Sequence, residues 1–149
     1  MKALVVYDSV YGNTEKIARS IGAAIADDAG VLRPNEIATS ELELIDLLIG
    51  GAPTQGGRPT RPIQDFLKAI PGPGTRDLSV AAFDTRVPAR WVGIFGYAAG
   101  RIARSLEAKG ARLVAPPEGF FVTGKEGPLR EGELERAARW AQEIAARVT

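Results

Sequence analysis

Short apolar runs alternate with helix-forming segments along the whole chain of 149 residues, and this alternation restricts the possible folds more than any other feature. Strands are expected at 2–7, 31–37, 44–49, 78–83 and 112–115, the last interrupted by Pro116 and Pro117 and resumed at 120–122. Helices are expected at 14–28, 62–70, 99–109 and 131–148. The sequence therefore predicts an α/β fold, with a parallel sheet covered by helices on both faces and joined by right-handed crossovers.

Two local signals refine this outline. Gly30 stands where a glycine would end the first helix, and Pro34 interrupts the second strand, which favours an edge position in the sheet. No internal repeat and no long linker divides the sequence, so residues 1–149 are expected to form a single domain.

The loops that follow the first, third and fourth strands are the expected ligand site, because doubly wound sheets bind ligands beyond the carboxyl ends of their strands. These loops are residues 8–14, 50–60 and 84–98. The first loop has the parts of a phosphate-binding turn, with small hydroxyls and a glycine between a buried strand and a helix: Ser9, Val10, Tyr11, Gly12, Asn13 and Thr14. Backbone N–H groups and the helix dipole attract an anion to such a turn. The competing interpretation is a plain tight turn with a helix cap.

The turn itself contains no lysine, which indicates a ligand with one phosphate rather than a triphosphate. A second segment, 119–126, has the glycine and lysine spacing of a triphosphate-binding loop. However, Glu126 stands where that loop needs Ser or Thr, and Phe120, Phe121 and Val122 favour a strand. We interpret 119–126 as a sheet extension followed by a turn.

Composition excludes several classes of function. The 19 basic and 18 acidic residues nearly balance, which favours neither nucleic acid nor a membrane surface as the main partner. Cysteine and histidine are both absent, so thiol chemistry, the commonest general base and the commonest zinc ligand are not available, and no metal site is expected. No signal peptide is visible, and no apolar stretch approaches the ~18 residues of a membrane span. We expect a cytoplasmic protein.

The second loop begins Gly50-Gly51-Ala52-Pro53-Thr54, and its glycines would let the backbone approach a flat ligand. The third loop carries Trp91, Phe95 and Tyr97, which would be exposed unless they cover a ligand or pack on the core. For 53–57 the alternative is a flexible surface loop, and for the aromatic residues it is core or interface packing. Arg86 could equally be a solvated surface charge.

The run Tyr7-Asp8-Ser9-Val10-Tyr11-Gly12-Asn13-Thr14-Glu15 resembles the phosphate loop of the flavodoxin family. Gly51-Ala52-Pro53-Thr54 is similar to the family's second loop, and the aromatic loop before Ala99-Gly100 occupies the position of the third. The resemblance covers essentially the whole chain. It implies a five-stranded sheet in the order 2-1-3-4-5, non-covalently bound FMN, and electron transfer with redox partner proteins or a small acceptor such as a quinone.

The resemblance also assigns roles to residues of this chain. Ser9, Tyr11, Asn13 and Thr14, with the backbone amides from Val10 to Thr14, would hold the phosphate. The ring and the ribityl chain would be bordered by residues of the second loop and of the fourth strand's end: Pro53, Thr54, Gln55, Gly56, Thr85 and Arg86. Phe95 or Trp91 would stack on the ring, and peptide flips at 55–57 would accompany reduction.

This sequence also differs from the family's soluble electron carriers, which are strongly acidic. Its charge is near neutral, and its third loop carries Arg86 and Arg90, which would favour reduced, anionic flavin. Two other functions therefore stay open beside electron carriage. One is a flavin-dependent quinone or protoporphyrinogen reductase-type enzyme, and the other is a cofactor-free binding module with the same fold.

Overall fold

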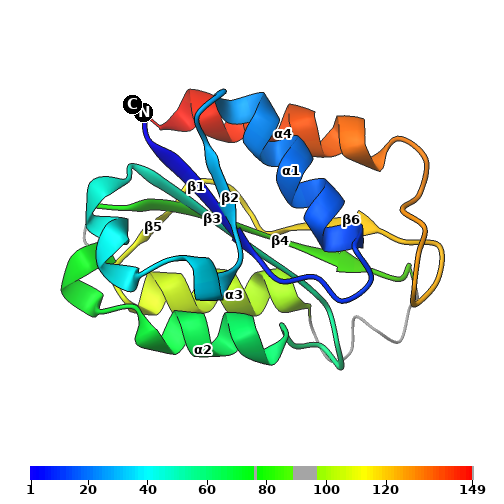
Figure 1. Cartoon of the computed structure of the whole chain (residues 1–149), viewed down its shortest axis with the longest axis horizontal. Helices are drawn as coiled ribbons and strands as arrows, with labels where there is room; N and C mark the ends of the chain where they lie inside the picture. Colours follow the sequence, from blue (N-terminus) through cyan, green and yellow to red (C-terminus); the bar gives the residue numbers. More distant parts are fainter. Residues whose placement is uncertain (76, 89–96, 149) are drawn as a thin grey trace.

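A computed structural model describes residues 1–75, 77–88 and 97–148 of the chain (Figure 1). A parallel sheet runs through the molecule with two helices on each face. Strands β1 (Ala3–Tyr7), β2 (Gly30–Leu32), β3 (Leu47–Pro53), β4 (Ser79–Arg86) and β5 (Arg112–Leu113) lie in the order β2-β1-β3-β4-β5. This confirms the expected doubly wound fold and strand order.

The fifth position of the sheet is shared by two short strands. β5 pairs with β4 at Ser79 and Val80, whereas β6 (Glu118–Phe121) pairs with β4 from Phe83 to Arg86. Pro116 and Pro117 lie between these strands, outside both ladders, in keeping with their lack of a backbone N–H donor. The expected interruption and resumption of the fifth strand is confirmed.

Helices α1 (Asn13–Ile25) and α4 (Glu133–Arg147) cover one face of the sheet, and α2 (Arg61–Ala69) and α3 (Ala98–Ala108) cover the other (Figure 1). Successive side chains of each strand point to opposite faces of the sheet and pack into two separate cores, one on each face. In β4, Val80 and Ala82 pack with α2 and α3, whereas Ala81 and Phe83 pack with α1 and α4. Each central strand is therefore apolar on both faces.

Several expected boundaries were wrong. α1 ends at Ile25 with Ala26 as its C-cap, so Gly30 begins β2 instead of ending a helix. β2 stops at Leu32, because Pro34 starts a short 3-10 helix (Pro34–Glu36), although its edge position is confirmed. A second 3-10 helix (Thr39–Leu44) occupies the beginning of the segment expected as the third strand, and Leu44 is exposed. A third (Gly72–Thr75) precedes β4.

The third and fourth strands run further than expected. Gly50 and Gly51 were expected in a ligand-binding loop but lie within β3, and Thr85 and Arg86 still belong to β4. The physical reason at Gly51 is packing: a Cβ there would come within 2.0 Å of the Phe83 ring. This glycine allows the close approach of an aromatic core residue.

Candidate functional site

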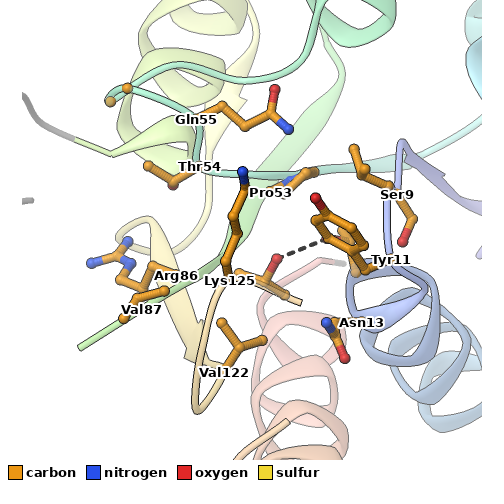
Figure 2. Close-up of a pocket in the computed structure, with 15 residues that line it drawn as sticks. Ser9, Tyr11, Asn13, Pro53, Thr54, Gln55, Arg86, Val87, Val122 and Lys125 are labelled. Carbon is orange, nitrogen blue, oxygen red and sulfur yellow. Dashed lines mark hydrogen bonds between the residues drawn. The ribbon is translucent and has the colours of Figure 1, made fainter. Parts of the chain in front are cut away.

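A pocket of about 680 Å³ lies where β1, β3 and β4 end (Figure 2). This volume is typical of small-molecule and cofactor sites. The lining residues come from four segments of the chain: Ser9, Val10, Tyr11, Asn13, Thr14, Pro53, Thr54, Gln55, Gly56, Gly57, Thr85, Arg86, Val87, Val122 and Lys125. The sequence predicted eleven of these fifteen by name for the ligand site, and Gly12, also predicted, lies between two of them.

The first loop turns from β1 into α1 through Gly12, whose φ of 93° is a left-handed conformation that favours glycine. The Gly12 N–H donates to Ser9 Oγ over 3.1 Å, and the Gly12 carbonyl accepts the first helical bond from Lys16. The N–H groups of the first turn of a helix have no partner within the helix. They and the helix dipole make this end of the pocket attractive to an anion.

Two residues of the first loop make contacts that the sequence did not predict. Thr14 Oγ1 lies 2.8 Å from Thr85 Oγ1, and both residues are buried. Asn13 Nδ2 donates to the carbonyl of Glu126 over 3.1 Å, so this side chain fastens the first loop to the segment after β6. Asn13 still lines the pocket, but its amide already has a protein partner.

The second loop is a closed turn. Gln55 and Arg58 exchange two backbone hydrogen bonds of 2.8 and 3.0 Å. The two residues that separate them, Gly56 and Gly57, have φ values of 58° and 77° respectively. Arg101 Nε donates to the Gly57 carbonyl over 2.8 Å, and Thr54 Oγ1 accepts the Ala98 N–H over 3.1 Å. Residues of α3 therefore hold this turn at both ends.

Arg86 is not a solvated surface charge. Its Nε and Nη2 donate to the two carboxylate oxygens of Asp84 over 2.7 and 2.8 Å, and its guanidinium stacks on the Tyr97 ring at 3.4 Å. Asp84 is fully buried and also accepts the Ala99 N–H over 2.9 Å. The positive charge expected at this end of β4 is thus offset by a buried carboxylate. Arg90, Trp91 and Phe95 lie outside the described residues, so their expected roles stay predictions.

Sequence reasoning missed four lining residues: Gly57, Val87, Val122 and Lys125. The last two come from segment 122–132, which follows β6. Because β6 is parallel to β4, its carboxyl end opens at the same edge of the sheet. Including the loop after the fifth strand among the ligand loops would have found Val122 and Lys125. The interpretation of 119–126 as strand and turn is confirmed, yet this turn borders the pocket.

Glu133, the first residue of α4, contacts the end of β6. It is buried, accepts the Phe121 N–H over 2.7 Å and pairs with Arg136 at 2.7 Å. The hydrogen bond from Arg136 is the largest cause that holds the pKa of Glu133 below its ordinary value, against the opposing effect of burial. Arg136 also pairs with Glu118 at 2.9 Å, so this cluster joins β6 to α4.

Within the described ranges, no group of three or more acidic side chains is placed to hold a metal ion. The helices that the structure describes are also too short or too polar to cross a membrane.

The doubly wound sheet, with a pocket at the helix N-terminus that follows its first strand, defines a mononucleotide-binding class of protein. The family model for flavodoxin matches residues 5–140. The chain therefore belongs to the flavodoxin family, whose members bind FMN and transfer electrons through it.

Solved structures agree in fold. A flavodoxin from the domain Archaea has a TM-score of 0.81 at 23% identity, with 98% of this chain and 97% of that chain covered. Oxidised flavodoxin 1 from Bacillus cereus has a TM-score of 0.82 at 22% identity, with both chains fully covered (100% and 100%). Two-electron reduced Megasphaera elsdenii flavodoxin has a TM-score of 0.72 at 20% identity, covering 97% of this chain and 98% of that one. No curated protein matches the sequence significantly.

Proposed function

We propose that this flavodoxin holds FMN with its phosphate at the N-terminus of α1 and its ring beside the turn 54–57. The observation that carries this proposal is a single pocket that joins a helix N-terminus to a mostly apolar slot. At the helix end, Ser9 and Thr14 add hydroxyls to the backbone N–H groups. Pro53 and Val87 add apolar surface to the lining, which suits an aromatic ring system.

Bound FMN supplies reversible electron transfer, and the protein supplies position and electrostatics. Thr54 and Thr85 also line the pocket, and their hydroxyls can orient a polyhydroxyl chain. The turn at Gly56 and Gly57 is held by Arg101, which fixes the backbone that would face the ring. Arg86 adds little net charge there, because Asp84 offsets it. Electron transfer needs no protein acid or base, which agrees with a chain without histidine and cysteine.

We further propose that the protein works in the cytoplasm as an electron carrier between redox partner proteins, in preference to a quinone or protoporphyrinogen reductase and to a cofactor-free module. Val10 and Tyr11 line the pocket and are 52% and 47% exposed. Exposed apolar side chains beside a redox centre suit transient contact with a partner.

An absorption spectrum of the purified protein, recorded before and after addition of FMN, tests the cofactor. We expect flavin bands that stay with the protein through gel filtration. A colourless protein that does not quench the fluorescence of added FMN would contradict the assignment. Turnover assays then separate carrier from enzyme, because a carrier needs an added reductase and shows little steady-state reduction of quinones or a porphyrinogen.

A further inference from the structure

We propose that Lys125 is the counter-ion of the flavin phosphate and makes the pocket prefer FMN to riboflavin. This inference rests on the proposed position of FMN. Lys125 lies on the segment after β6 and is not part of the first loop; its side chain extends into the pocket, with the ammonium toward Pro53 in the view of Figure 2. It therefore supplies from another part of the chain the cation that the turn 8–14 lacks.

Lys125 is positioned by a hairpin. The Arg130 N–H donates to the Phe121 carbonyl over 2.8 Å, the Thr123 N–H donates to the Pro128 carbonyl over 2.9 Å, and Val122 bridges Leu129. Residues 124–127 form the tip, where the Gly127 N–H donates to the Gly124 carbonyl over 3.0 Å. The backbone that carries Lys125 is therefore fixed before any ligand binds.

The tip of this hairpin rests on the first residue of α1. Asn13 Nδ2 donates to the Glu126 carbonyl over 3.1 Å. A Cβ at Gly127 would come within 2.7 Å of the Asn13 amide, and the φ of 102° at this position also favours glycine, so a larger residue would disturb this approach. These two contacts place the backbone of Lys125 beside the helix N-terminus that would receive the phosphate. The flexible side chain of a lysine can then follow the anion.

The charges around the pocket favour an anion at this point. The lining residues include two cations, Arg86 and Lys125, and no carboxylate. Arg86 is engaged by Asp84 at 2.7 Å, whereas no carboxylate among the described residues lies within 4.0 Å of the Lys125 ammonium. A phosphate monoester carries close to two negative charges at neutral pH. Lys125 is therefore the lining cation available to a dianion.

The test compares FMN with riboflavin, which lacks the phosphate, by fluorescence titration of apoprotein. For Lys125→Gln we expect the Kd for FMN to rise about tenfold, as for the loss of a charge-assisted hydrogen bond, and the Kd for riboflavin to change less than about twofold. For Lys125→Arg, the Kd values for both ligands should stay within about threefold of those of the parent protein. Added salt should weaken FMN binding less in Lys125→Gln than in the parent protein.

Lys16→Gln is the matched control. Lys16 is exposed on the first turns of α1 and does not line the pocket, so this variant loses the same charge near the same helix end. We expect its preference for FMN over riboflavin to match that of the parent protein. If Lys16→Gln lost as much affinity for FMN as Lys125→Gln, the effect would be one of general electrostatics and not of Lys125 in particular. If Lys125→Gln lost the same affinity for FMN as for riboflavin, Lys125 would contact the ring and not the phosphate. If its affinity for FMN were unchanged, Lys125 would be a solvated charge. Either result would overturn the proposal. Failure of the parent protein to bind FMN would instead contradict the proposed function.

Discussion

Thr14 Oγ1 lies 2.8 Å from Thr85 Oγ1, and this hydrogen bond joins the first turn of α1 to the end of β4. The two residues are 71 positions apart and only 1% and 5% exposed. Both line the pocket, Thr14 from the first turn of α1 and Thr85 from the end of β4. The bond therefore couples the helix that would bind the phosphate to the strand that borders the rest of the cofactor.

Thr85→Val should destabilise the apoprotein by about 1 kcal/mol, because it leaves the buried Thr14 hydroxyl without its partner. Thr14→Val should have a similar effect, and the double variant should lose less than the sum. Urea unfolding measures all three. Thr60→Val is the control, because Thr60 Oγ1 is buried and has no hydrogen-bond partner in the described structure. We expect Thr60→Val to keep the free energy of unfolding of the parent protein. If the losses of Thr14→Val and Thr85→Val were additive in the double variant, the two hydroxyls would not interact.

Arg86→Gln should lower the free energy of unfolding by about 3 kcal/mol, because Asp84 would keep a fully buried charge without its ion-pair partner. Asp84→Asn should lose less, since an amide oxygen can still accept the Ala99 N–H and Arg86 is partly accessible to water. Chemical denaturation of both single variants and of the double variant gives the coupling between the two residues. A smaller loss for Arg86→Gln than for Asp84→Asn would contradict the interpretation of this pair as a buried carboxylate with its counter-charge.

The sequence predicted the layers and the first loop because those depend on local patterns, whereas the strand order came from the resemblance to the flavodoxin family. A buried apolar strand, a glycine turn and an amphipathic helix are all visible within residues 3–25. The ends of β3 and β4 were not predictable in this way, because they depend on partners elsewhere in the chain. Gly51 pairs with Tyr7 of β1 and Phe83 of β4, and Thr85 and Arg86 continue their ladder with β6.

The same limit applies to the pocket. Lys125 was considered only within a local motif that Glu126 does not fit, and its approach to the first loop depends on the hydrogen bond between Asn13 and Glu126, 113 positions apart. The role of Arg86 was ambiguous for a similar reason. An arginine and an aspartate two positions apart in a strand point to the same face, but burial of Asp84 by α3 follows only from the packed structure.

Glu133→Gln should destabilise the protein by about 2 kcal/mol at neutral pH, because the charged hydrogen bonds to Arg136 and Phe121 are weakened or lost. Arg136 lowers the pKa of Glu133 in the folded state, so this contribution is complete above the ordinary glutamate pKa and is lost as the pH falls through the lower folded value. The stability difference between the parent protein and the variant should therefore shrink below about pH 4. Urea midpoints recorded across that pH range measure it. A difference that stays constant down to pH 2 would rule out titration of Glu133 as its source.

Gly51→Ala separates the two roles considered for the glycines of β3. The new methyl group would lie 2.0 to 2.5 Å from three atoms of the Phe83 ring, which is fully buried against Phe120 and Trp140. Because that ring has little room to move, we expect a loss of about 2 to 3 kcal/mol in the apoprotein, typical of an overpacked core. Gly50→Ala is the neighbouring control: its Cβ would lie 3.1 Å from one methyl group of Ile102, and a small shift can relieve that contact. Thermal unfolding of both apoproteins measures the contrast. Unchanged apoprotein stability in Gly51→Ala, combined with weaker FMN binding, would return Gly51 to the ligand site that the sequence suggested.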